Sequence, residues 1–83
     1  MTKEQIVEWA EELEEELMFM DGYDDCISGL AFNFGYGHSV AYSVDAILQK
    51  LMKDGMTMEE ADEFFSFNME GAYVGPKTPT FIH

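Results

Sequence analysis

The stretch that decides the fold is Cys26-Ile27-Ser28-Gly29-Leu30-Ala31-Phe32-Asn33-Phe34, followed by Gly35-Tyr36-Gly37. Large apolar residues alternate with small or polar ones, so Leu30, Phe32 and Phe34 share one side of an extended strand. The Gly-Tyr-Gly sequence is typical of a turn, and residues 38–42 resume a short β-like run. We therefore expect a β-hairpin over residues 26–42.

Upstream of the hairpin, residues 2–20 predict one long amphipathic helix. Apolar residues recur there at steps of three and four and share one helical face: Ile6, Ala10, Leu13, Leu17 and Met20. Thr2 is a candidate N-cap, with Gln5 at the reciprocal position of a capping box. The Asp21-Gly22 pair is the expected end, because glycine adopts positive φ without strain.

Downstream of the hairpin, the sequence predicts two short helices and a final strand. Ser43 begins the first of these helices, which stops at Gly55. Thr57-Met58-Glu59-Glu60 is a capping box that begins the second, which we expect to end at Gly71. The tail holds two prolines that cannot donate to a ladder, so we expect it to join the sheet as an edge strand.

These elements predict an α+β fold with the order α-β-β-α-α-β and a single domain over residues 1–83. A chain of 83 residues is long enough for one small hydrophobic core. We expect Leu30, Phe32 and Phe34 to pack against helix residues, namely Leu13, Leu17, Ile47, Leu51, Phe64 and Phe65.

The charge is strongly unbalanced, with 17 acidic residues against 4 Lys, no Arg and a net charge of −13. Direct nucleic-acid binding of the ordinary basic kind is excluded, because the chain offers no cationic patch to displace counterions from phosphates. No apolar run approaches the roughly 18 residues of a membrane span, and no signal peptide is evident. The one cysteine, Cys26, suits a reducing compartment, so we expect a cytoplasmic protein that does not enter membranes.

Ten of the carboxylates lie within residues 1–25, against Lys3 alone. Residues three and four apart are neighbours on a helix, so Glu4, Glu8, Glu11 and Glu15 are expected to form a row that is flanked by further glutamates. The candidate partner-binding residues are Glu4, Glu8, Glu11, Glu12 and Glu15. Such a row can imitate phosphates and occupy the basic groove of a nucleic-acid-binding protein. The alternative is a solvated face that keeps the protein soluble, although a charge of roughly 2–8 suffices for that.

The sequence gives weaker support to metal binding and to catalysis. Asp21, Asp24 and Asp25 lie close in sequence but lack the alternating ligands of a calcium loop, and no Cys or His cluster suits zinc. His38, Ser39 and Asp45 include the residue types of a catalytic triad without a recognisable nucleophile elbow. We therefore expect a non-enzymatic protein with no metal or cofactor.

The chain is also rich in Met and Phe, with seven of each. These residues either fill the core or form a partner surface, because both types are favoured where proteins meet. A small domain with surplus apolar surface often self-associates, so a homo-oligomer is the expectation that goes with the second alternative.

Beyond residue 22 the chain carries a set of short motifs: Tyr23-Asp24-Asp25, Asp54-Gly55-Met56-Thr57, Glu59-Glu60-Ala61, Glu63-Phe64-Phe65, Phe67-Asn68, Gly71-Ala72-Tyr73-Val74-Gly75 and Thr78-Pro79 before Phe81. In these motifs, residues 23–82 resemble a family of short acidic uncharacterised proteins of tailed bacteriophages and prophages. The resemblance implies a phage setting and no particular activity, cofactor or active site, and the acidic N-terminal segment lies outside it. In a phage setting, small acidic proteins disable host nucleases, restriction systems or CRISPR effectors by occupying nucleic-acid sites. An inhibitor of this kind is one expectation, and an accessory or assembly protein that acts through apolar docking is the other.

Overall fold

The computed structural model of the chain describes residues 2–33, 37–70 and 78–83. The elements follow in the order α1 (Lys3–Glu12), η1 (Asp24–Cys26), β1 (Ile27–Asn33), β2 (Gly37–Ser43), α2 (Val44–Lys53), α3 (Met58–Phe65), η2 (Ser66–Glu70) and β3 (Thr80–Ile82). The α+β class and the α-β-β-α-α-β order expected from the sequence are confirmed. No helix in the described ranges has both the length and the apolar character needed to cross a bilayer.

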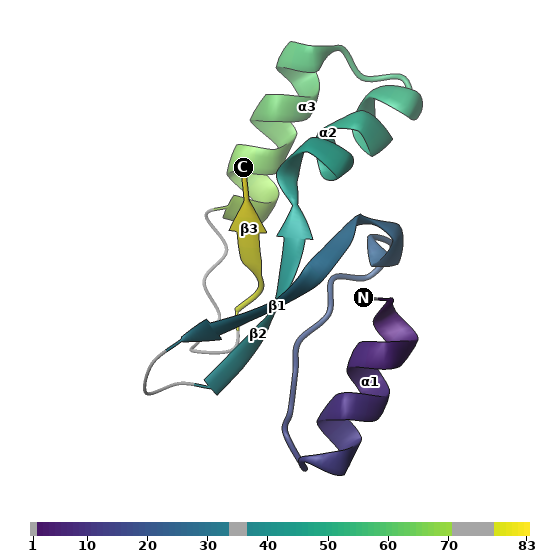
Figure 1. Cartoon of the computed structure of the whole chain (residues 1–83). Helices are drawn as coiled ribbons and strands as arrows, with labels where there is room; N and C mark the ends of the chain where they lie inside the picture. The colour runs from purple at the N-terminus through teal and green to yellow at the C-terminus, as the bar shows by residue number, and fades with distance from the viewer. Residues whose placement is uncertain (1, 34–36, 71–77) are drawn as a thin grey trace.

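The sheet has the strand order β1-β2-β3, with β2 in the centre (Figure 1). β1 and β2 form the predicted antiparallel hairpin, in which Leu30 lies opposite Val40. β3 pairs with β2 in parallel and lies at the edge, as the prolines in the preceding part of the tail suggested. The buried Ser39 hydroxyl is 2.8 Å from the hydroxyl of Thr80, which adds a side-chain hydrogen bond to this pairing.

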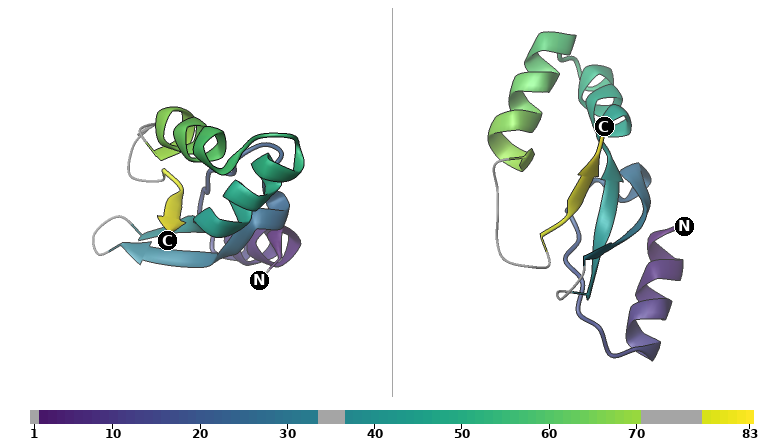
Figure 2. Two further views of the ribbon diagram at one scale, coloured as in Figure 1. Left: turned by 90° about the horizontal axis from the view of Figure 1, so that it is seen from above. Right: turned by 60° about the vertical axis from the view of Figure 1, so that its left-hand side comes forward.

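The molecule is elongated, with extents of 40 × 23 × 18 Å. α2 and α3 pack against each other at one end, and α1 lies at the other end, beside the hairpin (Figures 1 and 2). The acid-rich helix and the two C-terminal helices therefore present separate surfaces.

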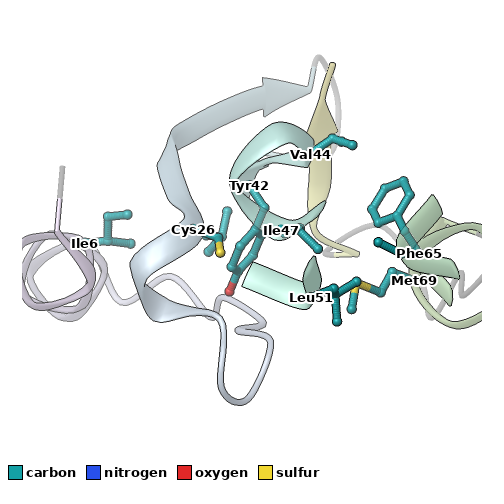
Figure 3. Packing of buried hydrophobic residues seen from close by; sticks show 10 residues of the cluster. Ile6, Cys26, Tyr42, Val44, Ile47, Leu51, Phe65 and Met69 are labelled. Carbon is teal, nitrogen blue, oxygen red and sulfur yellow. The ribbon is translucent and has the colours of Figure 1, made fainter. Parts of the chain in front are cut away.

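A contiguous core joins these parts. Its buried residues come from α1, η1, β2, α2, α3 and η2: Ile6, Cys26, Val40, Tyr42, Val44, Ile47, Leu51, Ala61, Phe65 and Met69. Tyr42 lies in the middle of the cluster, with Ile6 on one side and Phe65 on the other (Figure 3). The Tyr42 hydroxyl accepts a hydrogen bond from the backbone N–H of Met20 at 2.7 Å, so its polar end is satisfied inside the protein.

The helix ends of the C-terminal half confirm the expected capping. Ser43 and Thr57 accept hydrogen bonds from the backbone N–H groups of Ala46 and Glu60. In return, the Thr57 amide donates to the Glu60 carboxylate, which lowers the pKa of that group. Gly55 follows α2 with φ 110°, a conformation that favours glycine. The expected helix end at Gly71 lies outside the described residues.

The predicted long N-terminal helix is wrong in its length, because α1 ends at Glu12 instead of continuing to Met20. The amide of Glu15 donates to the carbonyl of Ala10, and the amide of Glu14 donates to that of Glu11. These are the two hydrogen bonds of a Schellman motif, with Glu14 at the left-handed position (φ 54°) that glycine usually takes. A longer helix is disfavoured here for two reasons. Glu14, Glu15 and Glu16 would repel one another, and their charges would lie at the negative end of the helix dipole.

We expect Glu14→Gly to stabilise the protein by about 0.5–1 kcal/mol, because glycine adopts left-handed φ without the steric cost that a side chain brings. Glu12→Gly is the matched control, since it removes the same charge from the last position of α1, and we expect it to destabilise by up to about 1 kcal/mol. Urea unfolding of both variants measures the two effects. Destabilisation by Glu14→Gly would contradict the assigned helix end.

Two of the expected core residues are exposed. Leu13 is 57 % exposed beyond the end of α1, and Phe32 is 65 % exposed in the last residues of β1. That end of the strand points away from α2 and α3 (Figure 1). Phe34 lies outside the described residues. The other expected core residues lie in the core or pack against it: Leu17, Leu30, Ile47, Leu51, Phe64 and Phe65.

Candidate protein-binding surface

The outer side of α1 carries four exposed carboxylates, which we call the acidic face: Glu4, Glu8, Glu11 and Glu12. The opposite side of the helix is buried through Ile6 and Ala10. This division follows from the helical repeat, because the glutamates occur at steps of three and four that differ in phase from the apolar residues. The structure thus places four of the five predicted partner-binding residues together on one exposed helical surface.

The charge density of the acidic face is close to that of a nucleic-acid strand. From Glu4 to Glu12 the helix axis advances about 12 Å, because each residue adds about 1.5 Å. Four carboxylates over that length give about one negative charge per 3–4 Å, compared with about 3.4 Å per phosphate along one strand of B-DNA. A groove that binds a phosphate backbone would therefore meet a similar linear charge on α1.

The nearby lysines are already paired with aspartates. Lys3 is 3.4 Å from a carboxylate oxygen of Asp24, and Lys50 is 3.0 Å from one of Asp25. The hydrogen bond from Lys50 lowers the pKa of the Asp25 carboxyl, and the same bond raises the pKa of Lys50. Within each pair the lysine and the aspartate neutralise each other, so these lysines do not reduce the negative potential over the acidic face.

Glu15, the fifth predicted residue, is not part of the acidic face. It lies beyond the helix end, and one carboxylate oxygen accepts the backbone N–H of His38 at 2.8 Å. The other oxygen is 3.2 Å from Nδ1 of the His38 ring. The expected row of Glu4, Glu8, Glu11 and Glu15 is therefore wrong at its last member, because the Schellman motif turns the chain back toward β2.

His38 also joins α1 to the hairpin through ring contacts. Its imidazole meets the Trp9 ring edge-on, with the centroids 4.6 Å apart. On the hairpin it meets the Phe32 ring at 5.1 Å, also edge-on. Together with Glu15, these contacts hold α1 against the sheet, and so fix the direction in which the acidic face points.

We expect Glu15→Ala to destabilise the protein by about 1–3 kcal/mol, because the partly buried amide of His38 loses its acceptor. Glu16→Ala removes the same charge from an exposed neighbour and is expected to change stability by less than about 0.5 kcal/mol. Chemical unfolding of the two variants compares them directly. Equal effects would show that the contact between Glu15 and His38 does not hold α1 in place.

The other candidates from the sequence are not brought together. His38 contacts Glu15, Ser39 contacts Thr80, and Asp45 accepts a hydrogen bond from Gln49 on its own helix. Among the described residues, no three His, Cys, Asp or Glu side chains form a group that would hold a metal ion. Cys26 is buried, and burial raises the pKa of its thiol.

Sequence reasoning missed the partnership of Glu15 and His38, which are 23 residues apart. It also missed the Tyr42 hydroxyl that fixes the chain at Met20. Neither contact has a local signal, because each depends on how the segment after α1 returns along the sheet.

The chain matches no protein-family model, no curated protein and no solved structure.

Proposed function

We propose that the protein is a small acidic binding protein that occupies a basic, nucleic-acid-binding surface of another protein. The observation that carries this proposal is the acidic face, with four exposed carboxylates at the linear charge density of a phosphate strand. Complementary charge speeds the encounter with a cationic partner and selects against acidic ones. The net charge of −13 adds a long-range attraction toward a cationic partner.

The proposed setting is a bacteriophage or prophage, and the proposed partner is a host defence or nucleic-acid-processing protein. The resemblance of residues 23–82 to short acidic phage proteins supports this setting. The proposed compartment is the host cytoplasm, and the unpaired thiol of Cys26 is compatible with its reducing conditions. No catalytic step is part of the proposal, because blocking a groove requires affinity alone.

The test is affinity capture from a host lysate with three forms of the immobilised protein. One is unchanged, and one is the acidic-face variant, in which Glu4, Glu8, Glu11 and Glu12 are replaced by Gln. The third is a charge-matched control variant, D54N/E59Q/D62N/E63Q, with its changes in exposed residues around α3. We expect the unchanged protein and the control to retain the same basic protein and the acidic-face variant to lose it. Equal retention by all three forms would contradict the proposal.

A second candidate is an accessory or assembly protein that self-associates or docks through apolar surface. It is favoured by Phe67, whose side chain is 83 % exposed, and by the exposed Phe32. Salt separates the two candidates, because screening weakens binding by the acidic face and leaves apolar docking intact. Retention that persists at about 1 M salt, where the Debye length is about 3 Å, would support the second candidate.

A further inference from the structure

A cavity of about 360 Å³ lies beside the segment that follows α1. Three stretches that are distant in sequence line it: residues 18–23, residues 64–69 of α3 and η2, and residues 78–81 at the start of β3. Its volume lies within the range of about 300–1,000 Å³ that is typical of small-molecule sites. The π-helical turn η2 forms part of the wall, and such turns are frequent at functional sites.

The wall is formed mainly by aromatic rings and methionines, among them Phe19, Tyr23, Phe81 and Met69. Aromatic faces attract cations, and flexible thioethers adapt to the shape of an apolar group. Lysine ammonium groups lie near two of these rings. Lys3 Nζ lies 5.1 Å from the centroid of Phe19, and Lys50 Nζ lies 5.8 Å from that of Tyr23.

The charge at the cavity is negative. Asp21 is the charged residue among the described residues of the wall, and it is exposed. The two lysines near the rings are each paired with an aspartate, so they do not cancel Asp21. The remainder of the chain adds to this potential, since its net charge is −13.

We propose that this cavity binds a small apolar organic cation, such as an aryl-ammonium group. The aromatic and methionine side chains would surround the apolar part, and Asp21 would face the positive charge. This site is distinct from the acidic face and does not depend on the function proposed for it.

The test uses two probes of nearly the same shape, phenyltrimethylammonium and its neutral counterpart tert-butylbenzene. Each probe is titrated into protein with ¹³C-labelled methionine methyl groups. We expect the cation to bind at least several-fold more tightly, and to shift the methyl signals of the cavity residues Met18, Met20 and Met69. Met52 and Met58 do not line the cavity, and their signals should not move.

Asp21→Asn tests the charge, with Glu16→Gln as the control that removes an exposed carboxylate from outside the cavity wall. We expect Asp21→Asn to weaken binding of the cation about two- to five-fold and to leave binding of tert-butylbenzene unchanged. Glu16→Gln should change the affinity for the cation by less than Asp21→Asn does, and it should leave the affinity for tert-butylbenzene unchanged. Three results would overturn the proposal: cavity methyl signals that do not move at millimolar cation, equal affinity for both probes, or equal effects of the two substitutions.

Discussion

Replacing Phe65 by Ala is expected to lower the free energy of unfolding by about 3–5 kcal/mol. The Phe65 side chain is 1 % exposed, and its ring packs edge-on against Phe81 with the centroids 5.0 Å apart. The substitution therefore opens a cavity where α3 meets β3. Since small domains are stable by about 5–15 kcal/mol, this is a large fraction of the total, and the melting temperature should fall by more than about 10 °C.

Phe67→Ala is the matched control for this prediction, because it is the same truncation two residues further along. Phe67 is 83 % exposed, so its removal should change stability by no more than about 0.5 kcal/mol. Thermal and urea unfolding followed by circular dichroism measure both variants. Similar losses for Phe65→Ala and Phe67→Ala would contradict the assignment of α3's buried side.

Features encoded by neighbouring residues were predictable from the sequence. Ser43 and Thr57 mark the starts of α2 and α3 because their side chains meet amide groups three residues later. Gly55 marks the end of α2 for the equally local reason that it adopts positive φ. The hairpin followed from alternation around a Gly-Tyr-Gly sequence, which is again a short-range signal.

The end of α1 was not predictable in the same way. The apolar repeat continues through Leu17 and Met20, and both residues do pack against the core. They do so from an irregular segment instead of a helix, after a Schellman motif that has Glu14 where glycine would signal it. Apolar spacing alone does not separate these outcomes, because either backbone brings the side chains to the same core.

The acidic face was predictable from the sequence, whereas the position of Glu15 was not. The difference is again whether a residue lies within the helix. Glu4, Glu8, Glu11 and Glu12 lie within the helix, so their spacing places them on one surface. Glu15 lies after the helix end, and its position depends on contacts with His38 that are distant in sequence. The cavity beneath residues 18–23 is also outside the reach of sequence patterns, because three separate stretches form its wall.

The acidic-face variant is expected to associate with a basic partner at least about tenfold more slowly at low salt, because charge complementarity raises association rates by about 10–1,000-fold. The four replaced side chains are exposed and the substitution keeps their shape, so the fold should persist. Relief of repulsion between glutamates at helical spacing will offset part of any loss in helix stability. Circular dichroism of the variant provides the check on folding.

The association rate of the unchanged protein, the acidic-face variant and the charge-matched control with the captured partner is the most direct test of the acidic face. The measurement is made at about 10 mM salt, where the Debye length is about 30 Å, and at about 1 M, where it is about 3 Å. We predict that at low salt the acidic-face variant is slower than the control by several-fold or more, although both have lost four charges. At high salt the three rates should agree within about twofold, because screening removes the long-range attraction. Equal rates for the acidic-face variant and the control at low salt would contradict the claim that α1 carries the binding surface.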